Sequence, residues 1–288
     1  MVDRVLQYIV RVRGSQPIRM DKAIKIHPEA MERVTGYIGR KAIDSVNHIL
    51  DLFAFTYRIF VLALSRPKAG RTIVGRVIIQ QLYFTAVQAM PVIIPIALLI
   101  GCMVIIQFAK LSGQYDFGRI SVLLIIRELG PIITALIVIL RSATAVTIEV
   151  SYMRVLHELD AIEMSGMDPI RIVCLPRLVG ITIAVCGLFV VFDLVSILGG
   201  YAIVWMVTYI PMSGFLYQIA KSITLTDIFV GAIKAIMFGI AITVTCLYRG
   251  FETKRQITEV PVATSRSAIE CFLYCLVINV FISTIFYM

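Results

Sequence analysis

The sequence is short of charge: only 16% of its 288 residues are charged, whereas 59% are hydrophobic and the mean hydropathy is +0.90. Soluble domains carry about 25% charged residues, so a water-soluble enzyme, a disordered chain and a fibrous protein are all excluded. Residues 1–76 hold 14 Lys and Arg against 6 Asp and Glu, a net charge of +8, and the remainder has a net charge of only +1. Because that remainder is so apolar, nucleic acid is a poor partner for the basic region, and an anionic membrane surface is the simpler one.

Several functional motifs are also missing. The sequence has no GxxxxGK[ST] phosphate loop, so we expect no cofactor in this chain and place ATP and Mg²⁺ in a partner. No Ser–His pair, HExxH motif or carboxylate pair has catalytic spacing, which argues against an enzyme. The first forty residues lack the apolar run of a signal peptide and are too acidic for an organelle leader. Cys271 and Cys275 would share a helix face, but without His or carboxylates nearby the six cysteines indicate neither a disulfide framework nor a metal site.

Five long apolar segments predict an all-α integral membrane protein. A spanning helix needs about 20 mainly apolar residues. Candidates occupy 91–109, 121–153, 178–205, 227–248 and 268–288. The first candidate follows a more polar part of the charge-free stretch 77–109, which predicts a lead-in helix. We therefore divide the chain into a basic cytoplasmic or interfacial region, 1–76, and a five-span domain, 77–288.

An amphipathic helix is predicted ahead of the spans. Apolar residues recur at helical spacing from Val46 to Leu64, and Lys and Arg residues flank them on both sides. This pattern favours a helix that lies in the membrane interface, with its cations reaching lipid headgroups. A soluble helix packed on a partner is the alternative.

The distribution of Lys and Arg predicts the orientation. The N-terminal region, the segment 151–177 and the loop 249–267 together hold 21 of the 27 basic residues, and the loops on the other side hold three. The positive-inside rule therefore places the N-terminus in the cytoplasm. With five spans, the C-terminus lies outside.

The connection between the second and third spans contains helix-boundary signals. Asp160 and Glu163 resemble an N-terminal capping pair, and Gly166 is a natural C-terminal stop. Asp168 and Pro169 are suited to cap and begin the next helix. The spacing predicts a short amphipathic helix on the cytoplasmic face, and it fits a helix docked on a partner and a tight interhelical connection equally well.

Charged residues inside the apolar segments are costly to bury and indicate functional sites by default. They are Arg127, Glu128, Arg141, Glu149 and Lys234. An alternative for Arg127 and Glu128 is an outer interfacial position from which they extend into water.

Two further pairings are suggested by spacing. Asp193 and Lys234 could pair inside the bundle, or each could reach water near the end of its span. Glu270 and Arg266 lie four residues apart and could form a helix-surface pair.

The same charged segments resemble the MlaE/YrbE permease family, the membrane subunits of ABC transporters that work with MCE-domain lipid-binding proteins. The resemblance extends from about Gln81 to the C-terminus, and residues 1–70 show none. The runs that carry it are Arg127-Glu128-Leu129-Gly130-Pro131, Arg141, Glu149, Met153-Arg154, Glu158 to Ile170, Pro176-Arg177, Ile233-Lys234 and Thr264-Ser265-Arg266.

This resemblance implies a homodimeric permease in the inner membrane of a bacterium that moves phospholipid or a related lipid. It implies a cytoplasmic ATPase on each protomer and an MCE protein on the outer side. It places Arg127 and Glu128 near a lipid-binding cavity between protomers. The residues it assigns to an ATPase-coupling helix are Glu158, Asp160, Glu163, Met164, Gly166, Asp168 and Pro169. The alternatives are an ion- or metabolite-coupled secondary transporter, although five single spans cannot form equal inverted halves, and a membrane assembly scaffold.

Four positions depart from the family pattern. Leu140, Ala143 and Ser151 stand where relatives usually carry glycine. Small residues let membrane helices approach closely, so Leu140 in particular predicts looser packing of the second span. His157 replaces a usual acidic residue just before the coupling segment, which predicts an altered fit to the ATPase.

Overall fold

The protein is described by a computed structural model over residues 43, 47–62, 71–110, 124–208 and 224–287. Within these ranges the chain is helical apart from short connections and contains no strand, which confirms the all-α prediction. The chain divides into two compact units, Met1–Asp51 and Leu52–Met288, and the helices from Arg71 onward belong to the second. The boundary between 76 and 77 that the charge distribution suggests stays a prediction.

In the described residues, five helical segments are long and apolar enough to cross a membrane: Val74–Val104, Ile125–Val155, Ile170–Ala202, Leu225–Glu252 and Ile257–Phe286. The first joins α3 (Arg71–Thr85) through a 3₁₀ turn, η2 (Val87–Ala89), to α4 (Met90–Lys110). The predicted lead-in helix and first span are both confirmed by this arrangement.

The remaining spans follow the predicted order. The third is α9 (Leu175–Thr208), entered through a π-helical turn, η5 (Ile170–Cys174). The fourth is α11 (Leu225–Glu252), and the fifth is α12 (Val260–Tyr287), which follows the 3₁₀ turn η6 (Ile257–Glu259).

The second span is irregular. Two π-helical turns, η3 (Ile125–Leu129) and η4 (Ile139–Ala143), alternate with the regular helices α6 (Gly130–Val138) and α7 (Thr144–Val155). Single π turns inside α-helices occur frequently at functional sites. Both turns here contain charged residues, Arg127 and Glu128 in η3 and Arg141 in η4.

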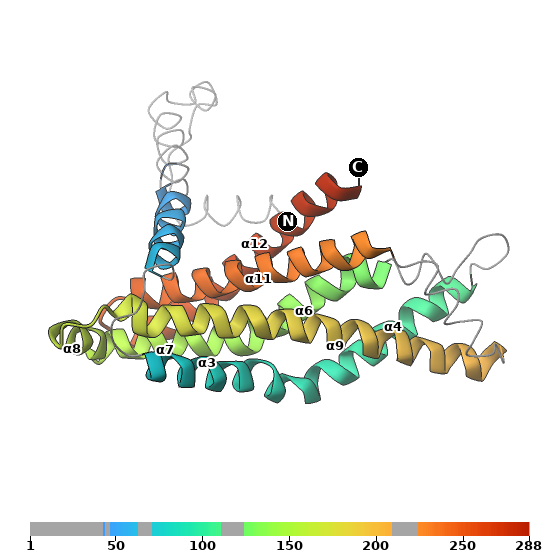
Figure 1. Ribbon diagram of the computed structural model, residues 1–288, viewed down its shortest axis with the longest axis horizontal. Helices are drawn as coiled ribbons and strands as arrows, with labels where there is room; N and C mark the ends of the chain where they lie inside the picture. Colours follow the sequence, from blue (N-terminus) through green and yellow to red (C-terminus); the bar gives the residue numbers. More distant parts are fainter. Residues whose placement is uncertain (1–42, 44–46, 63–70, 111–123, 209–223, 288) are drawn as a thin grey trace, which may run out of the picture. The chain divides into compact units, whose positions relative to one another are not determined.

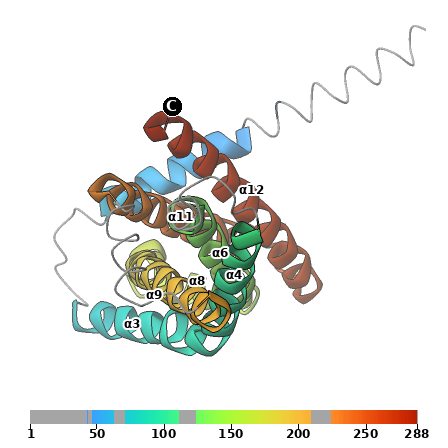
Figure 2. The same ribbon diagram turned by 90° about the vertical axis from the view of Figure 1, so that its right-hand side faces the viewer.

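Helix α9 packs against α3, α4 and α11, as Figure 1 and Figure 2 show from two directions. Glycines set its contact with α11: a Cβ at Gly239 would lie 2.7 Å from Thr182, and one at Gly231 would lie 2.7 Å from Phe189. Since the residue numbers rise on one helix as they fall on the other, α9 and α11 are antiparallel. Close approach through small residues is a common way for membrane helices to associate.

Hydroxyl groups join the second span to α11 and α12. Thr147 Oγ1 lies 3.0 Å from Ser267 Oγ, and it donates to Cys246 O at 3.3 Å. Ser151 Oγ lies 2.8 Å from Thr253 Oγ1, and both residues are buried. Ser151 therefore contributes a buried hydrogen bond at a position where glycine is usual.

The looser packing expected from Leu140 does not arise within the described chain. Its side chain is 63% exposed and points away from the core, whereas Ala143 on the same π turn is buried. Leu140 therefore changes the outer surface of the second span and leaves the interior contacts intact.

The described helix over 47–62 presents apolar residues outward. In the second compact unit, Phe53 and Tyr57 are exposed, whereas Phe55 and Ile59 pack against the core. Val46 and Leu64, the limits of the predicted amphipathic pattern, lie outside the described residues. The exposed apolar side chains suit a membrane interface or a partner, and both predictions stand.

Gly101 allows α4 and α9 to touch, because a Cβ there would lie 2.0 Å from Ser196 O. We expect Gly101→Ala to destabilise the fold by about 1–3 kcal/mol through overpacking. The thermal unfolding midpoint of the full chain in detergent should fall. Gly187→Ala on α9 is the matched control, since a Cβ there meets nothing within 4 Å. Equal midpoints for the two variants would contradict the contact between α4 and α9.

Candidate functional site

Lys234 of α11 is fully buried, and its ammonium group organises one end of the bundle. Its Nζ donates to Arg127 O at 2.7 Å, to Glu128 Oε1 at 3.2 Å and to Ser283 Oγ at 2.7 Å. An ammonium group has three donors, and here each of them has an acceptor. This charge therefore satisfies the usual condition for burial, full hydrogen bonding and an opposite charge.

The position of Pro131 explains why a backbone carbonyl is open to Lys234. In α-helical spacing, Arg127 O would accept from the N–H of residue 131, but proline has none. Gly130 N instead bonds to Ile125 O, five residues back, which closes the π turn. Lys234 supplies the donor to Arg127 O, so the Gly-Pro sequence and the lysine are parts of one arrangement.

Two polar residues of α12 complete the environment of Glu128. Asn279 Nδ2 donates to Glu128 Oε2 at 2.7 Å, and the Ser283 hydroxyl donates to Glu128 Oε1 at 2.8 Å. Asn279 and Ser283 are four residues apart, so they lie on the same helix face. Spans two, four and five therefore meet at this carboxylate, whose side chain is 33% exposed.

Arg127 forms a second ion pair beside the first. Its Nη2 lies 2.6 Å from Asp227 Oδ1, and the Asp227 side chain is 1% exposed. Asp227 Oδ2 also accepts from the backbone N of Thr224 at 3.0 Å and from its hydroxyl at 2.7 Å, forming the capping box of α11. The guanidinium is thus held at the start of the fourth span.

We call Arg127, Glu128, Asp227, Lys234, Asn279 and Ser283 the polar cluster. They come from η3, α11 and α12, at the end of the bundle away from α8 (Glu158–Met164). Two cations and two anions make the cluster electrically neutral.

The predicted pair between Asp193 and Lys234 is wrong, because Lys234 binds Glu128 instead. The antiparallel contacts of Gly231 with Phe189 put Asp193 level with residue 227, seven residues or roughly 10 Å along α11 from Lys234. Asp193 Oδ1 lies against Gly130, where a Cβ would be 2.3 Å away. Among the described residues, this buried oxygen has no hydrogen-bond partner.

Arg141 has a structural partner at the break in the first span. Its Nη1 donates to Phe84 O at 2.8 Å, its Nη2 donates to Gln88 Oε1 at 3.1 Å, and its guanidinium lies 5.1 Å from the centre of the Phe84 ring. The helical ladder is interrupted between α3 and α4, so Arg141 compensates for a lost donor. It joins the second span to the first.

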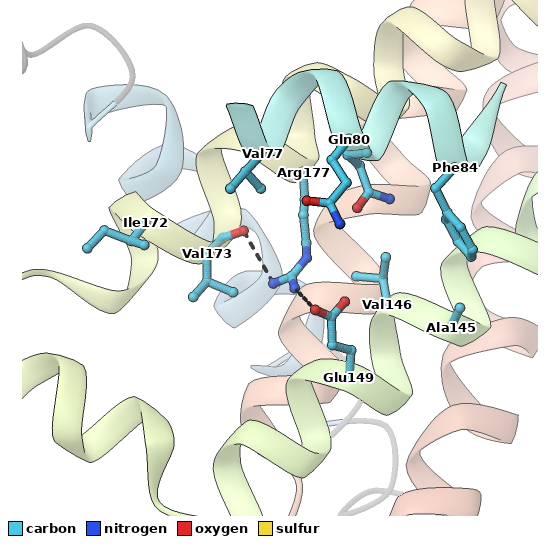
Figure 3. A pocket seen from close by; sticks show the side chains of 10 residues that line it. Val77, Gln80, Phe84, Ala145, Val146, Glu149, Ile172, Val173 and Arg177 are labelled. Carbon is cyan, nitrogen blue, oxygen red and sulfur yellow. Dashed lines mark hydrogen bonds and ion pairs between the residues drawn. The ribbon is translucent and has the colours of Figure 1, made fainter. Parts of the chain in front are cut away.

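Glu149 and Arg177 form an ion pair at the other end of the bundle. Arg177 Nη2 lies 2.7 Å from Glu149 Oε1, and the arginine is buried while the carboxylate is 58% exposed. Figure 3 shows both side chains in a cavity between α3 and α7. Arg177 was part of the family resemblance but was not singled out as a site residue, and no sequence spacing indicates a pair 28 residues apart.

The connection after the second span folds into the predicted short helix, α8 (Glu158–Met164), which Figure 1 shows beyond the end of α7. Gly166 has φ +79°, and the N–H groups of Gly166 and Met167 bond to Glu163 O and Ile162 O. These two bonds form a Schellman motif, so the predicted stop at Gly166 is confirmed.

The predicted restart at Asp168 and Pro169 is also confirmed. Asp168 Oδ1 accepts from Ile170 N at 3.0 Å, and Pro169 occupies the first turn, where its missing N–H leaves no intrahelical bond unmade. The side chain of Asp168 thus fixes the backbone between α8 and η5.

The capping pair predicted at Asp160 and Glu163 is wrong. Helix α8 begins at Glu158, and its N-cap is His157, three residues before Asp160, in the left-handed conformation with φ 61°. Asp160 is the third residue of the helix, where a negative charge still complements the helix dipole. Its carboxylate forms ion pairs and hydrogen bonds with three other side chains.

Asp160 joins α8 to two neighbouring segments. It lies 3.3 Å from Arg154 of α7, 2.8 Å from His157 Nδ1 and 2.8 Å from Arg255, which follows α11. The hydrogen bond with His157 is the largest influence on the pKa of Asp160, and with Arg255 and Arg154 it lowers that pKa below the usual value. The carboxylate therefore stays ionised at neutral pH, and its stabilising contribution is lost only as the pH falls through that lowered pKa.

Glu270 does not pair with Arg266 as spacing suggested. It accepts from Arg249 Nε at 2.7 Å, and a second bond joins Arg249 Nη2 to Glu270 Oε1. This bidentate geometry is stronger than a single contact on a helix surface, so the pair forms between α11 and α12.

Spacing alone could not find Asp227, Asn279 and Ser283. Asp227 was predicted only as the first residue of a span, and the other two are uncharged residues in an apolar helix. The available signal was that Asn279 and Ser283 lie four residues apart, which predicts that both are on one face of the helix. It does not predict that this face contacts Glu128. The side chains of Arg127, Glu128 and Lys234 meet as a group, whereas Arg141 and Glu149 lie elsewhere along the second span.

In the part of the chain that the structure describes, five helical segments of membrane length and a buried charged network at one end define a multi-pass membrane protein. The chain is similar to a probable ABC transporter permease protein of Rickettsia prowazekii, 26% identical over 243 residues, which are 83% of this chain and 91% of that protein. It is similar to the intermembrane phospholipid transport system permease protein MlaE of Haemophilus influenzae, 27% identical over 215 residues, 73% of this chain and 82% of that protein. A probable ABC transporter permease protein of Synechocystis is 26% identical over 214 residues, 71% of this chain and 80% of that protein.

The family described as Permease MlaE matches residues 78–285. The chain therefore belongs to the MlaE permease family, and the resemblance recognised in its sequence is confirmed. Membership in a permease family favours a transport subunit over an enzyme and supports a multi-pass inner-membrane protein.

Lys234 provides a test of the polar cluster. Replacing it by Met leaves Glu128, Ser283 and Arg127 O without their shared donor, and removal of one partner of a buried pair costs about 3–5 kcal/mol. We expect Lys234→Met to lower the unfolding midpoint strongly, and the double variant with Glu128→Gln to recover part of the loss. Lys254→Met, at an exposed position, is the control. A Lys234→Met midpoint equal to that of the control would contradict the described network.

Proposed function

We propose that this chain is the membrane permease subunit of an ABC-type transporter that moves phospholipid or a related lipid between the inner membrane and an MCE-protein partner outside it. Family membership and the similarity to a protein named for intermembrane phospholipid transport support this proposal. The working unit is a homodimer with a separate ATPase on its cytoplasmic face, where ATP and Mg²⁺ bind. The observation that carries the proposal is the construction of α8.

Helix α8 is attached to the bundle by one face and exposed on the other. Leu159 is 3% exposed and belongs to the core, and Ile162 packs against that core. Met164 is 83% exposed, and Glu158 and Glu163 are exposed beside it. A short, firmly bounded helix that presents methionine and carboxylates outward is suited to a groove on a partner, because flexible Met side chains adapt to apolar surfaces.

The placement of α8 also suits coupling. Asp160 contacts Arg154 of α7 and Arg255 after α11, while Asp168 fixes the start of the third span. A displacement of α8 by the ATPase would therefore act on three spans at once. His157 determines the first turn of this helix, and the altered fit expected from it remains part of the proposal.

Charge reversal on the outer face of α8 tests the docking. We expect Glu163→Lys to lower recovery of the co-expressed ATPase with the tagged full chain by about tenfold or more, the equivalent of 1.4 kcal/mol. Glu259→Lys, in the loop before α12, is the matched reversal and should leave recovery unchanged. Asp168→Lys is less informative, because it removes the cap of η5.

Equal ATPase recovery with Glu163→Lys and the wild type, together with equal lipid movement in reconstituted membranes, would contradict this docking. Purification of the intact complex from native membranes without any ATPase would favour the secondary-transporter alternative.

The polar cluster is the proposed lipid contact. Arg127 and Glu128 are 29% and 33% exposed, whereas their partners Asp227 and Lys234 are buried. We propose that these two accessible groups face a lipid-binding cavity between the two protomers. Because buried partners hold both side chains in place, Arg127 and Glu128 can bind a headgroup without first changing conformation.

Neutralising Glu128 tests this contact. Glu128→Gln keeps the size of the side chain and one oxygen that can still accept from Lys234 and Ser283, so we expect a folded protein with about tenfold less co-purified phospholipid by mass spectrometry. Glu270→Gln is the control, because it removes a paired carboxylate from α12 at the opposite end. Equal lipid retention in both variants would remove Glu128 from the lipid site.

A further inference from the structure

A polar cavity lies at the α8 end of the bundle, away from the polar cluster. Its volume is ≈ 370 Å³, and α3, α7, η5 and the start of α9 form its walls. Gln80 and Gln81 of α3, Glu149 of α7 and Arg177 of α9 supply its polar groups. Figure 3 shows Gln80 and Arg177 reaching the same space from above, with Glu149 below them.

Arg177 is built into this cavity. It is 7% exposed, its Nη2 lies 2.7 Å from Glu149 Oε1, and its Nη1 donates to Val173 O at 3.5 Å. Its Nε is buried and has no hydrogen-bond partner among the described residues. A buried N–H of a charged group without an acceptor is costly, so the unoccupied donor indicates that a ligand oxygen belongs there.

Glu149 offers the complementary group. Oε1 accepts from Arg177, while Oε2 has no hydrogen-bond partner among the described residues, and the side chain is 58% exposed at the cavity. The cavity therefore contains one donor for an anion and one acceptor for a cation, side by side. The net charge of the pair is zero, so it suits a ligand that is itself zwitterionic.

The depth of the site favours a lipid over a soluble ion. Glu149 lies six residues before the end of α7, roughly 9 Å along the helix axis, where the second span ends. That distance places the cavity near the headgroup layer of the leaflet on the α8 side, which the charge distribution predicts to be cytoplasmic. Exposed apolar residues such as Ile79 and Tyr83 lie elsewhere on α3, the helix that forms one wall of the cavity.

We propose that this cavity binds the headgroup of a zwitterionic phospholipid with a primary amine. The phosphate oxygens accept from Arg177 Nε and from the Gln80 amide, and the ammonium group donates to Glu149 Oε2. Gln81 Nε2 already donates to Thr85 Oγ1 at 3.2 Å and holds the wall of the cavity in place. This site goes beyond the proposed function, because it lies at the opposite end from the polar cluster and needs no ATPase.

The close approach of α3 to α9 gives the cavity a fixed shape. A Cβ at Gly180, one turn after Arg177, would lie 3.0 Å from the Gln81 side chain and 3.3 Å from Ile78 O. The wall that carries Gln80 and Gln81 therefore packs directly on α9, the helix that carries Arg177. A preformed site of this kind binds without the cost of ordering its walls.

Lipid selectivity of the purified full chain tests the proposal. Native mass spectrometry in detergent, with added phosphatidylethanolamine, phosphatidylcholine or phosphatidylglycerol, measures the apparent affinity of the tightest lipid. We expect phosphatidylethanolamine to bind about tenfold more tightly than phosphatidylcholine, whose quaternary ammonium cannot donate a hydrogen bond to Glu149. Glu149→Gln should abolish that preference, and Glu259→Gln, outside the cavity, should retain it. Arg177→Met should weaken both zwitterionic lipids by a similar factor.

Equal affinities for the ethanolamine and choline lipids in the wild type, or an unchanged preference in Glu149→Gln, would overturn the site. Because Glu149 is exposed, that variant stays informative even where Arg177→Met fails to fold. If soluble phosphoethanolamine displaced the bound lipid at a concentration equal to that of the lipid, the site would bind the free headgroup as well as the lipid. That result would contradict the proposal that the ligand is a lipid. Failure of Glu163→Lys to release the ATPase would count against the proposed function and leave this result untouched.

Discussion

The buried ammonium group of Lys234 is the constraint on which one end of this protein depends. A charge in the apolar interior is tolerated only with a full set of partners, and Lys234 of the fourth span finds them on the second and fifth spans. Pro131 leaves Arg127 O open, the π turn η3 presents Glu128 beside it, and α12 contributes Ser283. The proline at the start of the second span and the lysine of the fourth are therefore complementary, because the carbonyl that Pro131 cannot satisfy accepts from Lys234.

The second span connects two different kinds of polar structure. At one end, η3 belongs to a buried network that fixes spans two, four and five, and at the other, α7 leads into α8, whose outer face is exposed. Between them, Arg141 at the second π turn ties the same span to the break in the first. Each charge along this helix thus attaches it to a different neighbour. A span with many such attachments moves together with its neighbours, which is what coupling between a docked partner and a distant lipid site requires.

The lengths of the apolar segments predicted the spans. The glycine that ends α8 and the Asp-Pro pair that begins the next helix predicted the end of α8 and the restart after it, because these signals are local properties of the chain. The pairing of charges could not be predicted in the same way. An ion pair between Asp193 and Lys234 was suggested only by their opposite charges, yet the antiparallel register of α9 and α11 separates them by about two helical turns. Asp160 looked like a cap, but its carboxylate binds His157 at the start of its own helix and Arg154 and Arg255 from two other segments. Partner choice depends on register between helices, and register is a tertiary property.

The ion pairs in the two polar sites share one asymmetry. Lys234 and Asp227 are buried while Glu128 and Arg127 are partly exposed, and at the other end Arg177 is buried while Glu149 is exposed. In each pair the hidden member fixes the position of the accessible one, and the neutral total keeps the cost of holding charge in an apolar medium low. The accessible member of each pair is then a charged group in a fixed orientation, although the pair as a whole is neutral. Such a surface favours ligands that carry both signs close together, as many lipid headgroups do, and gives no strong advantage to simple ions of either sign.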